Sequence, residues 1–345
     1  MMKKKLILLT ALLTIIFFSV LFVLNAILYT PNIKVEDKNA YILLEKKLPL
    51  DSLIEKISPY LQSKSTFKWA AKIKRFKAAK PGKYKLTDKM NNNHLINILR
   101  IGKQEEVNLT FNNQNSLEDL AGVVSTYLAP DSLDFLSAMK DKSFLEKNKF
   151  TTENALLMYL PNTYRFYYNT SPEKFRKKMK EEYKKFWNRE RIEKAKKIGL
   201  TPIQVGILAS IIQQESTKQE ELPVIAGVYL NRLKNNWLLQ ADPTIKYAYQ
   251  QKYGKDLVIK RVLNKHKEVD SPYNTYLYKG LPPGPICMPD IPSIDAVLNY
   301  KKHNYYYFVA DMKRPGYHQF STNLKDHINK ANSYHSSLNK LGIYK

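Results

Sequence analysis

The chain has 345 residues, of which 44% are hydrophobic and 12% aromatic, so it is long enough for one large folded domain or two. Its formal net charge is +25, and lysines spread along the chain supply most of it. The single cysteine, Cys287, excludes an internal disulfide.

The excess of positive charge is compatible with several acidic partners, including nucleic acid, an acidic membrane surface and an acidic polymer. The sequence has no recognition motif for nucleic acid, and its basic residues alternate with acidic ones on the helices that we expect. We therefore expect a solvated basic surface and no nucleic-acid partner.

The N-terminus has the pattern of a membrane anchor. A basic tail, residues 1–5, precedes an uncharged apolar run at residues 6–29. About 20 apolar residues suffice for a helix to cross a bilayer, and the run is longer than the apolar part of a cleaved signal peptide. We expect an uncleaved transmembrane signal anchor. The positive-inside rule puts the tail in the cytoplasm and the rest of the chain outside the inner (plasma) membrane, beside the cell wall.

A short polar linker, residues 30–39, leads into a small mixed subdomain at residues 40–104. The segment AYILLEK predicts a strand, and Pro49 and Asp51 open an amphipathic helix. A Pro-Gly turn precedes the short strand KYKL, and Asn93 is expected to cap a helix that ends at Gly102.

We expect one larger mixed domain at residues 105–345, which makes the fold class α+β. VNLTFNN predicts its first strand, and residues 117–127 and 132–139 predict helices. A long helix should start at Pro172 and end at Gly199, with a buried stripe that includes Phe175 and Met179.

The next helix places a carboxylate where chemistry is plausible. Thr201, Pro202 and Gln204 form a capping box with proline at the first helical position. On a helical wheel, Glu215 falls within the arc of the apolar residues. Burial disfavours an ionised carboxyl group and raises its pKa, which suits a general acid. The alternatives are an exposed residue on a fraying last turn, or a buried Glu paired with Arg232.

Several blocks beyond residue 200 resemble the endolytic murein transglycosylase (YceG-like) family. They are LASIIQQES, IAGVYLNRL, LQADPTIKY, SPYNTYLYKGLPPGPI, YYYFVAD and HQFSTNLKDHINKAN. The resemblance covers nearly the whole chain beyond the apolar run and is firmest at 200–332. It implies that Glu215 is the catalytic residue, and that the subdomain at 40–104 is LysM-like. Whether this subdomain binds glycan or is a spacer is left open.

The chain departs from the family pattern at two places. Met158-Tyr159 stands where the family commonly has Glu-Gly, so no role is carried over to that pair. Met288-Pro289-Asp290 replaces the usual Asn-Pro-Gly, which indicates a locally altered turn.

Polar and aromatic residues after Glu215 are candidates for substrate binding. The resemblance implies that Gln240, Asp242 and Thr244 face a sugar-binding cleft. The alternative is that these side chains only form hydrogen bonds with nearby backbone groups, as is common in a turn of this type. Tyrosine faces stack on sugars and amides bond their hydroxyl groups, which makes a second set of four candidates: Tyr273, Asn274, Thr275 and Tyr276.

A single catalytic Glu suffices for glycan cleavage if the substrate supplies the nucleophile. In peptidoglycan, the C6 hydroxyl of N-acetylmuramic acid can attack its own C1 and leave a 1,6-anhydro end. The resemblance implies an internal cut in nascent strands that ends their elongation, near peptidoglycan synthases. We expect no cofactor and no metal, since the 6 histidines are scattered. Two alternatives stay open: a muramidase that uses Asp242 as a second carboxylate, and a non-catalytic scaffold that binds the wall.

Overall fold

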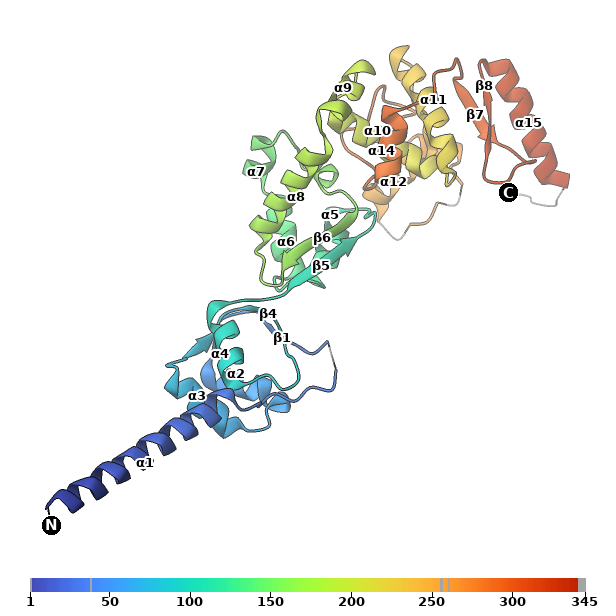
Figure 1. Ribbon diagram of the computed structural model, residues 1–345. Coiled ribbons are helices and arrows are strands. Elements are labelled where there is room, and N and C mark those ends of the chain that lie inside the picture. The colour runs from blue at the N-terminus through green and yellow to red at the C-terminus, as the bar shows by residue number, and fades with distance from the viewer. Residues whose placement is uncertain (1, 38, 255–256, 260, 341–345) are drawn as a thin grey trace. The chain divides into compact units, whose positions relative to one another are not determined.

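The computed structural model describes residues 2–37, 39–254, 257–259 and 261–340 (Figure 1). The chain forms two compact units. The first comprises residues 1–109, 125–131 and 164–171, and the second comprises 110–124, 132–163 and 172–345. The first unit thus takes in two later segments, whereas the sequence predicted an uninterrupted division after residue 104.

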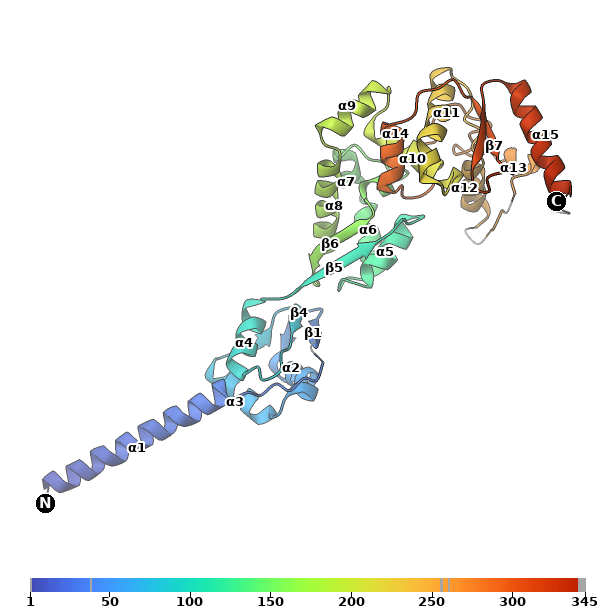
Figure 2. The same ribbon diagram turned by 45° about the vertical axis from the view of Figure 1, so that its right-hand side comes forward.

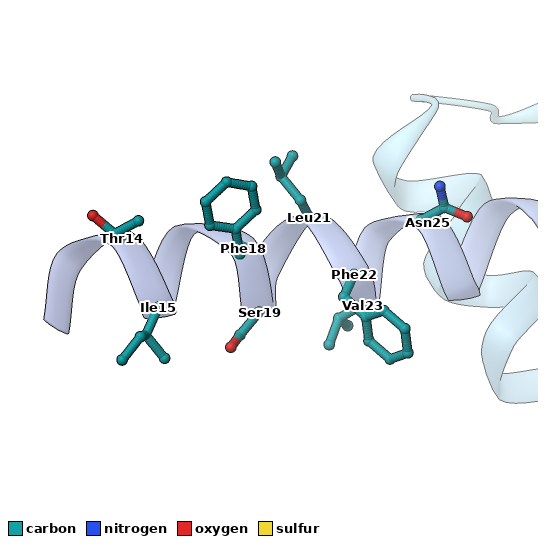
Figure 3. Close-up of a pocket in the computed structure, with 8 residues that line it drawn as sticks. All are labelled: Thr14, Ile15, Phe18, Ser19, Leu21, Phe22, Val23 and Asn25. Carbon is teal, nitrogen blue, oxygen red and sulfur yellow. The ribbon is translucent and has the colours of Figure 1, made fainter. Parts of the chain in front are cut away.

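Helix α1 (Met2–Tyr29) has the length and composition of a membrane span, and none of its residues is buried within the protein. Figure 3 shows eight of its side chains, from Thr14 to Asn25, projecting to different sides of one helix. The pocket that these side chains line is therefore a groove between side chains on the surface of one exposed helix, and no other described element contributes to it. At the end of α1, Ile27 and Leu28 pack on the core of the first unit.

The rest of the first unit is built from short elements around one apolar core. Its elements are β1 (Tyr41–Leu44), β2 (Leu48–Pro49), α2 (Leu50–Ile57), η1 (Ser58–Tyr60), α3 (Lys64–Ile73), β3 (Ala78–Ala79), β4 (Gly82–Lys85) and α4 (Asn92–Ile101). β1 pairs antiparallel with β4, and β2 with β3. The predicted strands and α2 are confirmed, while α3 was missed. The LysM-like assignment of this unit stays a prediction.

Helix α4 shows how local signals set its limits. Its N-cap is Asn91, whose side chain accepts from the backbone of His94, so the prediction of Asn93 as the cap was wrong by two residues. Gly102 ends the helix with a φ of 82°, which lies in the left-handed region that favours glycine. This end was predicted correctly.

The second unit starts along a strand pair and continues mainly as helices (Figure 2). Strand β5 (Glu106–Phe111) pairs with β6 (Asn162–Tyr167), and the division between the units passes through both strands. The helical elements up to residue 197 are α5 (Leu117–Ser125), α6 (Ser132–Met139), α7 (Lys142–Lys147), η2 (Ala155–Met158), α8 (Pro172–Phe186) and α9 (Arg189–Lys197).

The long helix predicted from Pro172 to Gly199 is two helices, so that prediction was wrong. α8 ends at Phe186, and Trp187 is buried in the core of the second unit. Asn188 then caps α9 by accepting from the backbone N of Arg191 at 3.0 Å. The cap offers the chain an alternative to continuous helix, which periodicity alone does not reveal.

The core of the second unit lies around α10 (Pro202–Glu215) (Figure 1). Helices α9, α11 (Leu222–Lys234), α12 (Asp242–Tyr253) and α14 (Ile291–Leu298) contact it. The remaining elements are η3 (Gln219–Glu221), α13 (Asn264–Lys267), β7 (Tyr307–Ala310), β8 (His318–Ser321) and α15 (Leu324–Lys340). β7 and β8 form an antiparallel hairpin, and α15 packs on it in both views (Figures 1 and 2). The mixed α and β composition predicted from the sequence is confirmed.

Candidate active site

Glu215 is the last residue of α10, a helix that starts with a capping box and ends at the C-cap Ser216. The predicted capping box is present: Gln204 N donates to Thr201 Oγ1 at 3.3 Å, and Thr201 N donates to Gln204 Oε1 at 2.9 Å. Every residue from Val205 to Ile212 is buried, because helices pack around α10. The predicted single apolar face was therefore wrong, and the position of Glu215 at the helix end sets its environment.

One oxygen of Glu215 is held by a buried tyrosine. The hydroxyl of Tyr229, on α11, donates to Glu215 Oε1 at 2.5 Å. Tyr229 is 1% exposed, and its ring contacts that of Phe308 edge-on with centroids 6.0 Å apart. A buried hydroxyl needs a partner, and this one is a strong charge-assisted bond when Glu215 is ionised. The carboxyl group is therefore oriented by a rigid neighbour.

The environment of Glu215 favours its protonated form. Burial of the carboxyl group raises the pKa of Glu215 from its ordinary 4.5 to about 7. The charge of Asp242 acts in the same direction, and the hydrogen bond from Tyr229 and the charges of Arg232 and Lys246 oppose it. The residue still keeps a partly exposed surface. At neutral pH such a carboxyl group can donate a proton in one step and accept one in the next.

The predicted turn before α12 is built on two buried threonines. Gln240 is exposed, with a φ of 49°. Its backbone N donates to the carbonyl of Thr275 at 3.0 Å, and Ala241 N donates to Thr275 Oγ1 at 3.0 Å. Thr244 Oγ1 donates to the Ala241 carbonyl at 2.7 Å and lies 2.8 Å from Thr275 Oγ1. These bonds fix the turn and present Gln240 and Asp242 at the surface.

Asp242 is the second carboxylate that acts on the site. It is exposed, and its Oδ1 accepts from the hydroxyl of Tyr276 at 2.6 Å. Burial and this bond together raise the pKa of Tyr276, which keeps the phenol a donor. Glu215 and Asp242 each have one tyrosine donor.

The other residues of the predicted sugar-binding set differ in exposure. Asn274 is buried, and its Nδ2 donates to the carbonyls of Lys267 and Val269 at 2.8 and 2.7 Å. Its Oδ1 accepts from Tyr276 N at 2.9 Å. Thr244, Asn274 and Thr275 thus form the support behind the turn, and direct sugar contact by them stays a prediction. Tyr273 and Tyr276 are partly exposed.

A polar groove runs beside this support. It consists of two cavities of about 560 and 420 Å³ that share Asn115, Tyr247 and Gln251 in their linings. Tyr273 lines it with its ring centroid 4.7 Å from that of Tyr247. Gln214 and Pro243, which adjoin Glu215 and Asp242 in the chain, line the larger cavity. Amides and tyrosine rings of this kind suit a polysaccharide.

Arg232 has a structural role. It is 7% exposed, its Nε donates to the carbonyl of Tyr306 at 2.8 Å, and its Nη1 donates to the carbonyl of Leu239. The alternative in which Arg232 pairs with Glu215 is therefore replaced by the hydrogen bond from Tyr229. The arginine ties the end of α11 to β7 and to the turn before α12.

The described residues contain no group of three or more His, Cys, Asp or Glu side chains placed to hold a metal ion. The expectation of chemistry without metal or cofactor stays a prediction. Among the histidines, His318 is partly buried and pairs with Glu221. Cys287 is buried near Gln214, with 3.4 Å between Sγ and Nε2.

Two residues of the site were missed from the sequence. Tyr229 lies 14 positions after Glu215, inside the apolar block IAGVYLNRL, where its hydroxyl is the only side-chain polar group before Asn231. A hydroxyl in a buried helix needs a partner, and that signal could have indicated it. Glu221 is the second missed residue. An acidic residue directly before an apolar helix is the pattern that could have indicated it.

The chain was also compared with known proteins. Residues 48–333 match the sequence profile of the YceG-like family. The chain belongs to this family. A Bacillus subtilis (strain 168) protein named endolytic murein transglycosylase is 43% identical over 133 residues, which is 39% of this chain and 35% of that protein. A Streptococcus pneumoniae (serotype 2, strain D39) protein of the same name is 36% identical over 142 residues, or 41% of this chain and 25% of that one.

The match thus spans about a third or less of the length of these curated relatives. Among solved structures, the crystal structure of a YceG-like protein from Listeria monocytogenes aligns with a TM-score of 0.55 and 25% identity. The alignment covers 87% of this chain and 97% of that one, so the fold of this YceG-like protein is shared over most of its length.

Proposed function

We propose that this YceG-like protein is a membrane-anchored lytic transglycosylase that cuts peptidoglycan glycan strands internally. The single observation that carries the proposal is the carboxyl group of Glu215, with a pKa of about 7 and one oxygen held by Tyr229. Two relatives that match about two fifths of this chain are named endolytic murein transglycosylases, which supports the same substrate class.

The proposed reaction uses Glu215 twice. The protonated carboxyl group donates to the glycosidic oxygen between N-acetylmuramic acid and the next N-acetylglucosamine, and the bond from C1 to that oxygen breaks. The C6 hydroxyl oxygen of the same muramic acid bonds to C1, and its proton passes to the Glu215 carboxylate. The acid is thereby restored, no water is consumed, and the product has a 1,6-anhydro end.

Neighbouring residues would hold the strand for this chemistry. The exposed side chain of Gln240 lies on the turn before α12, and that of Asp242 lies at the first residue of this helix. The partly exposed rings of Tyr273 and Tyr276 offer faces for stacking. The buried Thr244, Asn274 and Thr275 would keep that turn in place. Orientation of the bound strand supplies rate that proton transfer alone does not.

Helix α1 supports a location at the plasma (inner) membrane. Its length and apolar composition suit a single span, and the three lysines at its start favour a cytoplasmic N-terminus. The other parts of the chain would then lie outside the membrane, close to nascent glycan strands. Peptidoglycan synthases are the partners that such a position suggests.

A hydrolase that uses Asp242 as the second carboxylate is the alternative. It is kept because the charge of Asp242 acts on Glu215 and its own carboxylate is held by Tyr276. Digestion of purified peptidoglycan in water enriched in ¹⁸O separates the two reactions. Our proposal predicts anhydro ends without ¹⁸O by mass spectrometry. Reducing ends that carry ¹⁸O would establish the hydrolase.

A wall-binding protein without catalytic activity is the remaining alternative. It predicts that the full chain binds insoluble peptidoglycan and releases no fragments. Release of soluble anhydro fragments by wild type would exclude it.

A further inference from the structure

A second buried carboxylate lies a few residues after Glu215. Glu221 ends η3 and is 6% exposed. Its Oε1 accepts from the backbone N of His318 at 2.8 Å, and its Oε2 lies 3.0 Å from His318 Nδ1. Both carboxylate oxygens are therefore used to hold the first residue of β8. The catalytic role proposed for Glu215 does not use Glu221.

The same carboxylate also fixes the chain directly after Glu215. Ser216 ends α10 with extended backbone angles, and its Oγ donates to Glu221 Oε2 at 3.4 Å. The Oγ of Ser216 also accepts from Lys218 N at 3.0 Å. Ser216 is 8% exposed, so these bonds are largely shielded from water. The position at which α10 ends, and with it the backbone of Glu215, is tied to Glu221.

A second path of contacts leads from His318 to the carboxyl group of Glu215. The His318 ring meets Phe308 of β7 nearly edge-on, with centroids 5.2 Å apart at 83°. Phe308 in turn meets Tyr229 at 6.0 Å and 89°, and Tyr229 donates to Glu215. Edge-to-face pairs have a preferred geometry, so the place of His318 sets that of Tyr229.

Contacts at the turn of the hairpin strengthen the same junction. The hydroxyl of Tyr317 donates to the carboxylate of Glu220, and Lys218 Nζ lies 5.1 Å from the centre of the Tyr317 ring. The turn between β7 and β8 is thus docked on residues 216–221. Apolar side chains could also hold a hairpin here, but a carboxylate adds direction, because each of its bonds fixes one donor.

We infer that Glu221 and His318 are positioning residues for Glu215, acting through Ser216 on its backbone and through Phe308 and Tyr229 on its carboxyl group. The inference rests on the proposed role of Glu215 as the proton donor. If the contacts of Glu221 with Ser216 and His318 are broken, the end of α10 loosens and water reaches the carboxyl group of Glu215. Its pKa should then fall from about 7 toward the ordinary 4.5, because burial is the main cause of the shift and outweighs the opposite effect of weakening the Tyr229 bond.

Glu221→Gln tests the inference in the full chain. It keeps the size of the side chain but replaces one accepting oxygen with an NH₂ group that cannot accept from His318 Nδ1. We expect kcat to fall about tenfold or more with KM changed less than about twofold. The pH above which kcat/KM declines should move down by at least about half a unit. The charged and titratable groups that act on Glu215 stay unchanged: Tyr229, Arg232, Asp242, Lys246 and Tyr276.

Three further variants separate positioning from folding. His318→Asn can still donate from Nδ2 at about the place of Nδ1 but lacks the ring that meets Phe308. It should therefore lower the pH at which kcat/KM begins to decline by less than His318→Leu, which loses both contacts. Asp311→Asn is the matched control, because Asp311 is a carboxylate of the same hairpin, 6% exposed and bonded to Arg314 and Gln319. Asp311→Asn should lower the stability of the fold without changing the pH at which kcat/KM begins to decline.

Carboxyl ¹³C NMR of the full chain in detergent measures the pKa of Glu215 directly and does not depend on catalytic activity. The Glu215→Gln variant assigns the signal. A wild type that cleaves no glycan would refute the proposed function and leave this measurement intact. The inference is supported if Glu221→Gln and His318→Leu lower that pKa, His318→Asn lowers it less than His318→Leu, and Asp311→Asn does not lower it. It is overturned if Glu221→Gln leaves the pKa and kcat unchanged, or if Asp311→Asn lowers the pKa as much.

Discussion

The hydroxyl of Tyr229 lies 2.5 Å from Oε1 of Glu215 and reaches it from a different helix. This bond lowers the pKa of Glu215, while burial of the carboxyl group raises it more strongly. The two effects together leave a carboxyl group that is part protonated at neutral pH and fixed in direction. Each of the following predictions depends on this arrangement or on the residues that support it.

The rate of glycan cleavage should depend on pH through Glu215. A proton donor must start protonated, so kcat/KM should be level below neutrality and fall about tenfold per unit above a pH of about 7. Release of soluble fragments, measured from below pH 4.5 up to about pH 9 with folding checked at each pH, tests this. A decline that begins near pH 4.5 would show that Glu215 is not buried as described.

Tyr229→Phe should raise the pH at which kcat/KM begins to decline. Loss of the donor removes an influence that lowers the pKa of Glu215, so the decline should begin at higher pH, and kcat should drop about tenfold through lost orientation. Tyr159→Phe is the matched control, because Tyr159 is 1% exposed and its hydroxyl has no hydrogen-bond partner among the described residues. An identical shift in both variants would argue against a specific role for Tyr229.

Glu215→Gln should change how stability depends on pH. Because the pKa of Glu215 is raised in the folded state, its stabilising contribution is complete below the unfolded pKa and is lost as pH rises through about 7. Wild type should therefore lose up to about 3 kcal/mol relative to the variant between pH 5 and pH 9. Urea unfolding at these two pH values measures the difference. Parallel stability curves would contradict the raised pKa.

Thr275→Val should loosen the turn that presents Gln240 and Asp242. The variant leaves the buried N–H of Ala241 without its acceptor and removes one of the two partners of Thr244 Oγ1. An unsatisfied buried polar group costs about 1–3 kcal/mol, so the free energy of unfolding should fall by that amount. Thr275→Ser retains the hydroxyl and should restore most of it. Equal stability of both variants would show that the hydroxyl does not support the turn.

Two glycines should respond differently to alanine. A Cβ at Gly284 would lie 2.1 Å from the carbonyl oxygen of Glu153, so Gly284→Ala must displace the GLPPGP loop and should lower both stability and cleavage. Gly122 lies within α5 with open space around the Cβ position, and Gly122→Ala should raise stability by about 0.5–1 kcal/mol. Thermal unfolding compares them. A neutral Gly284→Ala would mean that the loop is not in close contact there.

Features set by neighbouring residues in the chain could be predicted from the sequence. The capping box at Thr201 and the stop at Gly102 each follow from residues within a few positions. The break between α8 and α9 is local too, but periodicity outweighed the cap at Asn188 in the prediction.

Features set by packing between segments distant in the sequence could not be predicted in this way. The wheel predicted one apolar face for α10, whereas neighbouring helices bury its centre on all sides. The partners of Glu215 and Glu221, Tyr229 and His318, lie 14 and 97 positions away. The sequence located the carboxyl group at the site, and the fold supplies the groups that orient it.

The central claim is that one carboxyl group carries the proton in glycan cleavage. The most direct measurement compares the initial rate at which wild type and Glu215→Gln release anhydro-ended fragments from purified peptidoglycan, with both proteins shown to be folded and to bind the same strands. The account predicts a rate at least about a hundredfold lower for the variant, since glutamine cannot donate that proton. Fragment release by Glu215→Gln at the wild-type rate would contradict it.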